Sequence, residues 1–300
     1  MPAQAVLITG CSAGGIGSAL AEAFQRQGLL VFATSRVASK MEHLEKLPNV
    51  TAIELDVSSP ESIADAVSIV HACTGGKLDY LVNNADIYMV MPVLDVDIKH
   101  AKKVFDVNLW GVLAVTQAFG HLVIAGQGSV INICSLSGYM NTPWMSRFGH
   151  ELTPPGGVAN HLFRQLPTNA QSLGIYAASK AAMLAYSETL RLEMAPFGVK
   201  VLSVVTSFVE SSLTADTNEL QIELPQTSLY KAAYQDMNAR LYGYPAKSKL
   251  PVHEYADKVV ADVMRGASGR VWRGGMALTA RFVLKLMPRS VKEGPLLPEK

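Results

Sequence analysis

The stretch "AVLITGCSAGGIGSALA", residues 5–21, decides the fold because a strand pattern, a glycine cluster and a helix pattern follow one another in it. Residues 5–9 are a short apolar run, which predicts a buried strand. The glycine cluster lets the backbone turn tightly and approach a pyrophosphate, which the positive end of the following helix attracts. In this context we expect a dinucleotide-binding loop, formed by residues that include Gly10, Ser12, Gly15, Ile16 and Gly17.

Further apolar runs, separated by helical patterns, follow this stretch. They predict strands over 29–34, 51–55, 78–82, 129–134 and 199–205. Helices are expected from the glycine loop to Gln27, over 39–46, from Ser59, over 97–119 and from the Tyr176 region to Ala195. Strands that are apolar throughout and alternate with helices indicate a parallel sheet covered on both faces. The sequence therefore predicts an α/β protein with a doubly wound parallel sheet, a Rossmann fold.

One domain is expected over residues 1–300, because no linker and no internal repeat interrupts the pattern. Residues 1–211 are interpreted as the cofactor-binding and catalytic core. The alternation stops after Ser211, so residues 212–300 are expected to form a substrate lid and a C-terminal extension.

Composition excludes several classes of protein. The chain has 49% hydrophobic and 17% charged residues and a net charge of +1, which gives no electrostatic reason to expect nucleic acid. The N-terminus lacks the features of a secretory signal, and no long uninterrupted apolar run predicts a spanning helix. The three cysteines lie far apart without metal-ligand spacing, so we expect free thiols, no metal site and a cytoplasmic protein.

Tyr176 and Lys180 are candidates for acid–base chemistry. They stand four positions apart in "GIYAASKAAM" (174–183), so one helical face carries both. A cation beside a phenol lowers the pKa of the phenol and makes it a proton donor or acceptor. Because such pairs also occur on ordinary surface helices, the pair alone does not establish a site.

The end of the second predicted strand bears on the cofactor. An acidic residue there would bind an adenosine ribose and repel a 2′-phosphate, but the chain reads "ATSR", with Thr34 and Arg36. The Arg36 guanidinium can contact a phosphate in bidentate fashion, which predicts NADP(H) as the cofactor. The alternative is a solvated surface arginine.

Taken in order, six motifs resemble the short-chain dehydrogenase/reductase family. They are the Thr9–Gly17 loop, Asp56-Val57, "NNA" (83–85), "NLWG" (108–111), "NICS" (132–135) and "YAASK" (176–180). The "TGCSAGGIG", "ATSR" and "GYMNTPW" stretches are similar to the fungal group around NADPH-dependent 1-acyldihydroxyacetone-phosphate reductases. That group also includes tailoring enzymes of secondary metabolism.

This resemblance implies roles for individual residues. Tyr176 would be the general acid/base, Lys180 would lower its pKa and hold the nicotinamide ribose, and Ser135 would bind the substrate carbonyl. Asn108 would position a water molecule for proton relay. The resemblance also implies cofactor contacts: Asp56 near the adenine, Asn83 lining the cleft, Ile16 in the glycine loop, and Val209 and Ser211 near the nicotinamide carboxamide.

Two features depart from the family pattern. Asp86 stands where "NNAG" has glycine, and its charge would either point outward or weaken cofactor binding. Ser135 and Tyr176 are 41 positions apart, which is wider than the family's spacing. Residues 145–173 account for the difference, either as a lid over the active site or as a translated intron.

The sequence thus predicts an NADPH-dependent oxidoreductase that interconverts a ketone and a secondary alcohol on a lipid-like or polyketide/terpenoid substrate. Alternatives are a 1-acyldihydroxyacetone-phosphate reductase and a non-catalytic dinucleotide-binding protein. We also expect a dimer or tetramer by analogy with the family. Residues 270–289 interleave basic and apolar side chains, so they suit either a packing helix or peripheral contact with the membrane of the endoplasmic reticulum or a lipid droplet.

Overall fold

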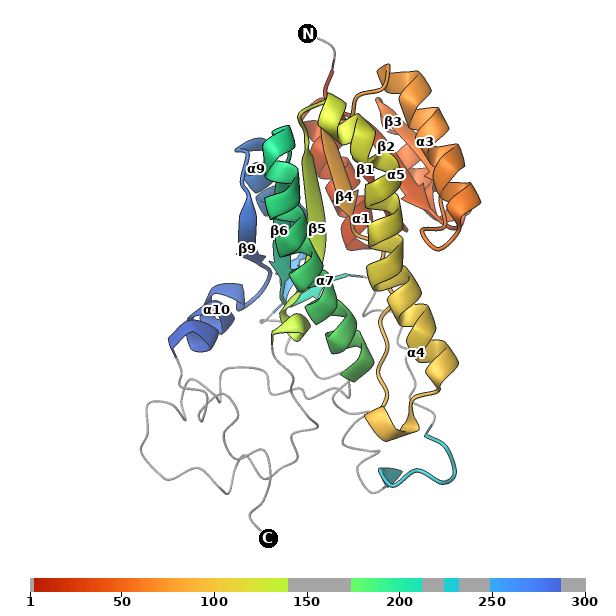
Figure 1. Cartoon of the computed structure of the whole chain (residues 1–300), viewed down its shortest axis with the longest axis vertical. Helices are drawn as coiled ribbons and strands as arrows, with labels where there is room; N and C mark the ends of the chain where they lie inside the picture. Colours follow the sequence, from red (N-terminus) through yellow and green to blue (C-terminus); the bar gives the residue numbers. More distant parts are fainter. Residues whose placement is uncertain (1–2, 140–173, 212–223, 232–248, 287–300) are drawn as a thin grey trace.

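The computed structural model describes residues 3–139, 174–211, 224–231 and 249–286, and its centre is a seven-stranded parallel sheet (Figure 1). The order across the sheet is β3-β2-β1-β4-β5-β6-β9. Every neighbouring pair is parallel. The strands are β1 (Ala5–Ile8), β2 (Leu30–Ser35), β3 (Val50–Glu54), β4 (Tyr80–Asn83), β5 (Ser129–Ser135), β6 (Lys200–Thr206) and β9 (Gly269–Arg273).

Helices cover both faces of this sheet. The helices α3 (Pro60–Thr74), α5 (Val112–Ala125) and α7 (Gly174–Met194) lie on one face, and α1 (Ile16–Arg26), α2 (Glu42–Glu45) and α9 (Val252–Met264) lie on the other. Successive side chains of β1 point to opposite faces. Val6 and Ile8 therefore belong to the core beneath α1 and α9, whereas Leu7 belongs to the core beneath α3 and α5.

Local sequence explains the helix boundaries near the site. The Ser59 side chain accepts a hydrogen bond from the Ser62 N–H, and Pro60 occupies the first turn of α3. The helices α4 (Ile98–Phe105) and α5 are joined by a π-helical turn, η3 (Asp106–Gly111). The joined helix, Ile98–Ala125, has the length and hydropathy (1.5) of a membrane span, but 50% of its most apolar window is buried, as in a core helix.

The predicted α/β fold is confirmed, and each of the six predicted strands is present within two residues of its expected ends. Two elements after residue 211 also complete the core, which the sequence did not indicate. The helix α9 packs on α1, and β9 extends the main sheet beside β6, so both belong to the core. The stretch 270–289 begins in β9, and a helix, α10 (Ala277–Leu286), follows only after a turn.

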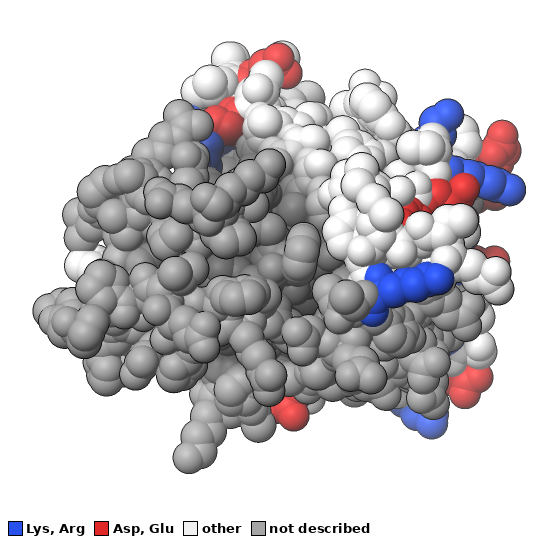
Figure 2. Space-filling model, turned by 90° about the horizontal axis from the view of Figure 1, so that it is seen from below, with Lys and Arg blue, Asp and Glu red and all other residues white. Residues whose placement is uncertain are grey.

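Smaller elements surround the carboxyl ends of the strands. They are η1 (Ala38–Met41), η2 (Val93–Asp95), η4 (Leu136–Gly138), η6 (Ala195–Phe197) and a two-stranded sheet of β7 (Val209–Glu210) and β8 (Leu250–Pro251). Residues 140–173, which include the segment interpreted as a lid or an intron, lie outside the described residues. On the face seen in Figure 2, described basic and acidic side chains lie interspersed, in keeping with the net charge of +1.

The strand order reverses between β1 and β4, so the chain leaves these neighbouring strands toward opposite faces and opens a crevice at their carboxyl ends. The loop after β1 approaches the segment after β4 closely at Gly10. This residue has φ +75°, and a Cβ atom there would lie 2.8 Å from the Ala85 Cα. Only glycine satisfies both the left-handed backbone and the close approach.

A matched pair of substitutions separates these two requirements. Gly28 has a similar φ of +82°, but a Cβ atom on it would meet no described atom within 4 Å. Gly28→Ala should cost about 1–2 kcal/mol of unfolding free energy, the cost of a left-handed residue with a side chain. Gly10→Ala should cost more, because backbone atoms must also move apart. Urea unfolding of the two variants checks this, and equal losses would contradict the close approach.

Candidate active site

The first turn of α1 is open to an anion. Its N-cap residue, Gly15, makes no side-chain capping bond, and no acidic residue lies in the first turn. The first N–H groups of a helix lack partners within the helix and carry partial positive charge. The glycine loop is also tied to the second strand, since the Cys11 N–H donates to the Thr34 carbonyl at 2.7 Å. These residues fit the pyrophosphate of a dinucleotide.

At the end of β2, polar groups gather around the loop. The hydroxyls of Ser12 and Ser35 are 3.2 Å apart. The buried Thr34 Oγ1 has no hydrogen-bond partner among the described residues, so this atom is available to a ligand or water. Arg36, directly after β2, is exposed, so its guanidinium is accessible to a phosphate.

Asp56 follows β3 on the same side of the crevice. Its Oδ1 accepts hydrogen bonds from the Ser58 N–H at 2.9 Å and from the Ser58 hydroxyl at 2.6 Å. Burial raises the pKa of this carboxyl, but the Ser58 bonds and the charges of Arg36 and Lys103 outweigh burial and leave the pKa below its ordinary value. Asp56 therefore favours its negatively charged form, and its contact with the adenine stays a prediction.

The segment after β4 holds the glycine loop through Asn84, which the sequence reasoning did not single out. The Asn84 amide donates to the carbonyls of Thr9 and Gly10 at 2.9 and 3.0 Å. In return, the Thr9 hydroxyl accepts from the Asn84 and Ala85 N–H groups, both at 2.9 Å. These four bonds fix the two walls of the crevice to each other.

Asn83, which we expected to line the cleft, has its side chain in the core instead. Its amide donates to Thr116 at 3.1 Å and to Asn132 at 2.9 Å, and Asn132 donates in turn to Ser187 at 2.8 Å. This buried chain joins α5, β4, β5 and α7. Only 2% of Asn83 is exposed, so its side chain does not line the cleft and instead joins the core elements that carry the site.

Tyr176 and Lys180 lie on one buried face of α7, as predicted, with 6% and 2% of their surfaces exposed. The Lys180 Nζ stands 5.6 Å from the centre of the Tyr176 ring and donates to the Ile133 carbonyl at 3.3 Å. The Ser135 hydroxyl, at the end of β5, lies near enough to the phenol to lower its pKa. Despite their separation in sequence, these three residues meet because α7 packs beside β5 and β6.

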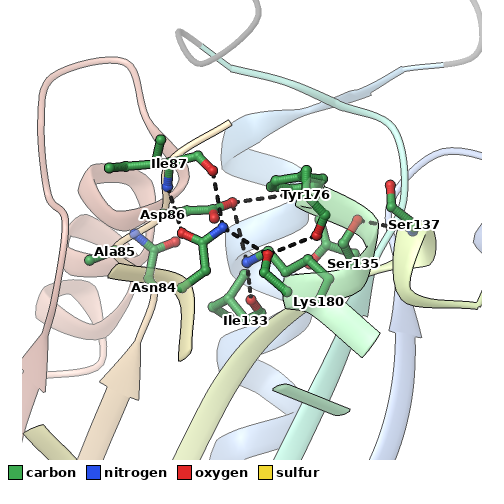
Figure 3. Close-up of polar contacts among 12 residues, drawn as sticks. Asn84, Ala85, Asp86, Ile87, Ile133, Ser135, Ser137, Tyr176 and Lys180 are labelled. Carbon is green, nitrogen blue, oxygen red and sulfur yellow. Dashed lines mark hydrogen bonds and ion pairs between the residues drawn. The ribbon is translucent and has the colours of Figure 1, made fainter. Parts of the chain in front are cut away.

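Asp86 lies between the tyrosine and the lysine (Figure 3). Its Oδ2 accepts from the Tyr176 hydroxyl at 2.9 Å and pairs with the Lys180 Nζ at 3.2 Å. Its Oδ1 is buried and has no hydrogen-bond partner in the described part of the chain. Asp86 therefore points into the site, so the alternative in which its charge points outward is wrong.

The expectation that Lys180 lowers the pKa of Tyr176 does not hold in this arrangement. Burial of the phenol and then the negative charge of Asp86 raise the pKa of Tyr176 well above its ordinary value, against a smaller opposing effect of the Ser135 hydrogen bond. A carboxylate that accepts the phenol's proton in a hydrogen bond stabilises the protonated phenol. This arrangement thus favours the protonated form of Tyr176.

Asn108 fixes the chain directly after Asp86. It is fully buried in η3, where its Oδ1 accepts from the Ile87 N–H at 2.8 Å and its Nδ2 donates to the Ile87 carbonyl at 3.0 Å. The second Nδ2 hydrogen goes to the Ser179 hydroxyl at 3.1 Å. π-Helical turns are often found at functional sites, and this one turns Asn108 toward the crevice wall. The side chain acts here as a clamp, and its role in proton relay stays a prediction.

Val209 and Ser211 follow β6 at the same edge. Val209 is buried and pairs with Leu250 in the β7–β8 ladder. Phe208, next to it, accepts from the N–H groups of Leu250 and Gly275. The loop after β6 is therefore held by the C-terminal segment, and its contact with a nicotinamide stays a prediction.

Together, an open helix terminus at the topological switch point and a buried Tyr–Lys–Ser cluster define a dinucleotide-dependent oxidoreductase of the Rossmann class. A sequence model of the family described as "short chain dehydrogenase" matches residues 4–149 and 168–221. The chain belongs to this family, whose members bind a nicotinamide dinucleotide and act on small molecules. The match omits residues 150–167, which fall inside the segment 145–173.

Relatives and solved structures agree with this assignment. The chain is 41% identical to "Short-chain dehydrogenase PC-15" of Penicillium crustosum over 100% of this chain and 98% of the relative. It is 33% identical to the "NADPH-dependent 1-acyldihydroxyacetone phosphate reductase" of Schizosaccharomyces pombe, over 98% and 89%. A short chain dehydrogenase from Burkholderia cenocepacia, solved with NADP, shares the fold at a TM-score of 0.70 and 23% identity, over 99% and 98%.

The three thiols provide a test of how closely the site is packed. Burial raises the pKa of Cys11, in the glycine loop, to about 12 and that of Cys134, beside Ser135, to about 11, whereas Cys73 is exposed. The thiolate is the reactive form, so both buried thiols should stay inert near neutral pH. Ellman's reagent should label one thiol in the native protein and all three in denaturant. Cys73→Ser should remove the fast reaction, and rapid labelling of two thiols would contradict the burial.

Proposed function

We propose that this protein is an NADPH-dependent reductase that converts a ketone to a secondary alcohol on an apolar, lipid-like or secondary-metabolite substrate. The observation that carries the proposal is the buried Tyr176 phenol, whose hydroxyl donates to Asp86 at 2.9 Å and lies near Lys180 and Ser135. Reduction of a carbonyl builds negative charge on its oxygen, and a proton donor must meet that charge. NADPH, when bound, supplies the hydride.

The residues of the chain divide the remaining work. The Ser135 hydroxyl, which also accepts from the Ser137 N–H at 3.1 Å, can donate to the carbonyl oxygen and orient it. Tyr176 delivers its proton to the same oxygen. Lys180 holds the cofactor ribose and supplies positive charge, while Asn108 keeps the chain around Asp86 and Ile87 in place.

Support for NADPH over NADH comes from the end of β2. The described end of this strand, Ser35 and Arg36, has no acidic residue, and the charge of Arg36 acts on Asp56, which follows the neighbouring strand β3. An exposed guanidinium at this place can pair with a 2′-phosphate. The NADPH-dependent relative from Schizosaccharomyces pombe and the NADP-bound structure from Burkholderia cenocepacia point the same way.

Support for an apolar substrate comes from exposed apolar side chains near the start of α7. Val93 lies against the start of α7, since a Cβ atom on Gly174 would collide with its side chain. Val93, Leu94 and Leu229 are 61%, 72% and 84% exposed, and the Ser228 hydroxyl anchors the Leu229 segment to Asp95 at 2.6 Å. Exposed apolar groups gathered near a site often mark a binding surface.

A 1-acyldihydroxyacetone-phosphate reductase is the second candidate, favoured by the 33% identical relative. Its substrate carries a phosphate, which needs a cationic partner. In the described part of the site the cation is Lys180, which already pairs with Asp86 at 3.2 Å. This pairing supports a neutral substrate over a phosphorylated one.

Two surfaces support the remaining proposals about partners. Trp110 in η3 and Leu192 and Phe197 near the end of α7 are 55%, 60% and 54% exposed, which supports assembly of copies through these helices. In α10, Leu278 and Phe282 are exposed beside Arg281, which supports peripheral contact with a membrane surface.

Turnover tests the function directly. The purified protein should oxidise NADPH when given apolar ketones, and more slowly with 1-acyldihydroxyacetone phosphate. Tyr176→Phe removes the proton donor but keeps the ring, so the turnover number should fall about 10²–10⁴-fold. NADPH fluorescence titration should show nearly unchanged cofactor affinity in this variant. Binding of NADPH without oxidation on any ketone would contradict the reductase.

Arg36 is tested by cofactor preference. Arg36→Ala should weaken NADPH binding about tenfold or more, because a charge-assisted hydrogen bond contributes about 1.5–3 kcal/mol. Binding of NADH should change little, since it lacks the phosphate. Arg26→Ala, which removes a surface arginine paired with Asp257 at 2.6 Å, serves as the matched control. An unchanged NADPH/NADH ratio in Arg36→Ala would contradict the assignment.

A further inference from the structure

The Asp86 carboxylate contacts both members of the Tyr176–Lys180 pair through a single oxygen. Oδ2 lies 2.9 Å from the phenol oxygen and 3.2 Å from the lysine nitrogen. The side chain of Lys180 is 3% exposed and that of Asp86 is 14% exposed, so water screens this pair weakly. The phenol therefore has a neutralised ion pair beside it in place of an uncompensated cation (Figure 3).

We propose that Asp86 is a positioning residue that keeps the proton on Tyr176 and thereby extends carbonyl reduction to more alkaline pH. The inference rests on the proposed function, in which Tyr176 donates its proton to the substrate oxygen. Asp86 itself neither donates that proton nor needs to touch the substrate. Its carboxylate acts through the phenol's hydrogen bond and through the charge that it cancels on Lys180.

In the described part of the chain, the groups that face the phenol come from three elements. The segment after β4 contributes Asp86 and the Tyr88 ring, whose centre lies 5.0 Å from that of Tyr176. The end of β5 contributes Ser135, and α7 contributes Lys180. Of these groups, Asp86 carries a full negative charge. Burial of the phenol, Asp86 and Tyr88 all raise the pKa of Tyr176.

The direction of the pH effect follows from the protonation state that reduction needs. Reduction requires the protonated phenol, so activity is present below the pKa of Tyr176 and is lost as pH rises through it. A pKa raised by burial and by Asp86 moves this loss to higher pH. Without the carboxylate, the Lys180 ammonium would favour the phenolate, and the loss would occur at lower pH.

Asp86→Asn removes the charge and keeps an oxygen that can accept from the phenol. In this variant the alkaline limb of kcat/KM for ketone reduction should move down by about one pH unit or more. The alkaline rise of kcat/KM for alcohol oxidation should move down with it, because both limbs report the same phenol. Asp86→Gly, which restores the residue of the common family motif, should move the limbs in the same direction.

Asp65→Asn is the matched control, since it removes an exposed carboxylate on α3, far along the chain from the site. Its pH profile should coincide with that of the wild type. Urea unfolding of each variant identifies a loss of folding, which would lower activity at every pH without moving the limb. Wild-type activity with identical alkaline limbs in wild type and Asp86→Asn would overturn the inference.

A readout that needs no turnover completes the test. In protein labelled with ¹³C at the tyrosine ζ carbon, the resonance that Tyr176→Phe removes should titrate at lower pH in Asp86→Asn than in the wild type. Coincident titrations would overturn the inference even for an inactive protein. Absence of NADPH oxidation in the wild type would instead contradict the proposed function, so the two failures are distinguishable.

Discussion

The hydrogen bonds between Thr9 and the Asn84–Ala85 segment are the constraint on which the site depends. They hold the loop after β1 against the segment after β4, although the two strands send the chain to opposite faces of the sheet. Gly10 allows this approach because it has no Cβ. The open terminus of α1 and the Asp86 carboxylate are both fixed by this junction, one on each side of it. The helix terminus proposed to bind the cofactor and the residues proposed to transfer the proton therefore share one support.

Most of the fold could be predicted from the sequence because the central strands are apolar throughout and strongly periodic with their helices. The strand β9 could not, since in "GRVWR" Arg270 and Arg273 flank only two apolar residues, Val271 and the buried Trp272, and the stretch looks like a surface turn. An edge strand needs only one well-covered face, and its pairing with β6 is a long-range contact without a local signal. The packing of the helix α9 in the core could not be predicted either, because its partner α1 lies near the other end of the chain.

The site could be predicted as a set of residues but not as a set of interactions. Tyr176, Lys180 and Ser135 meet where the motifs implied, and Asn108 lies close by. Asn83 was expected to line the cleft, but alternation along β4 turns it into the core and leaves its neighbour Asn84 to face the glycine loop. Sequence also identified Asp86 as unusual, but only the folded arrangement places its oxygen on both the phenol and the ammonium.

The position of Asp86 changes what the Tyr–Lys pair means physically. A lone buried cation beside a phenol favours the phenolate, whereas a buried ion pair presents little net charge and leaves burial to dominate. Burial and the Asp86 carboxylate both disfavour the charged phenolate, so both favour the protonated form of Tyr176. Asn108 holds Ile87 from both its N–H and its carbonyl, which prevents the carboxylate from retreating with the backbone. One substitution, an aspartate at the position where the family motif has glycine, can therefore raise the pKa of Tyr176 while the fold, the helix α7 and the neighbouring side chains stay in place.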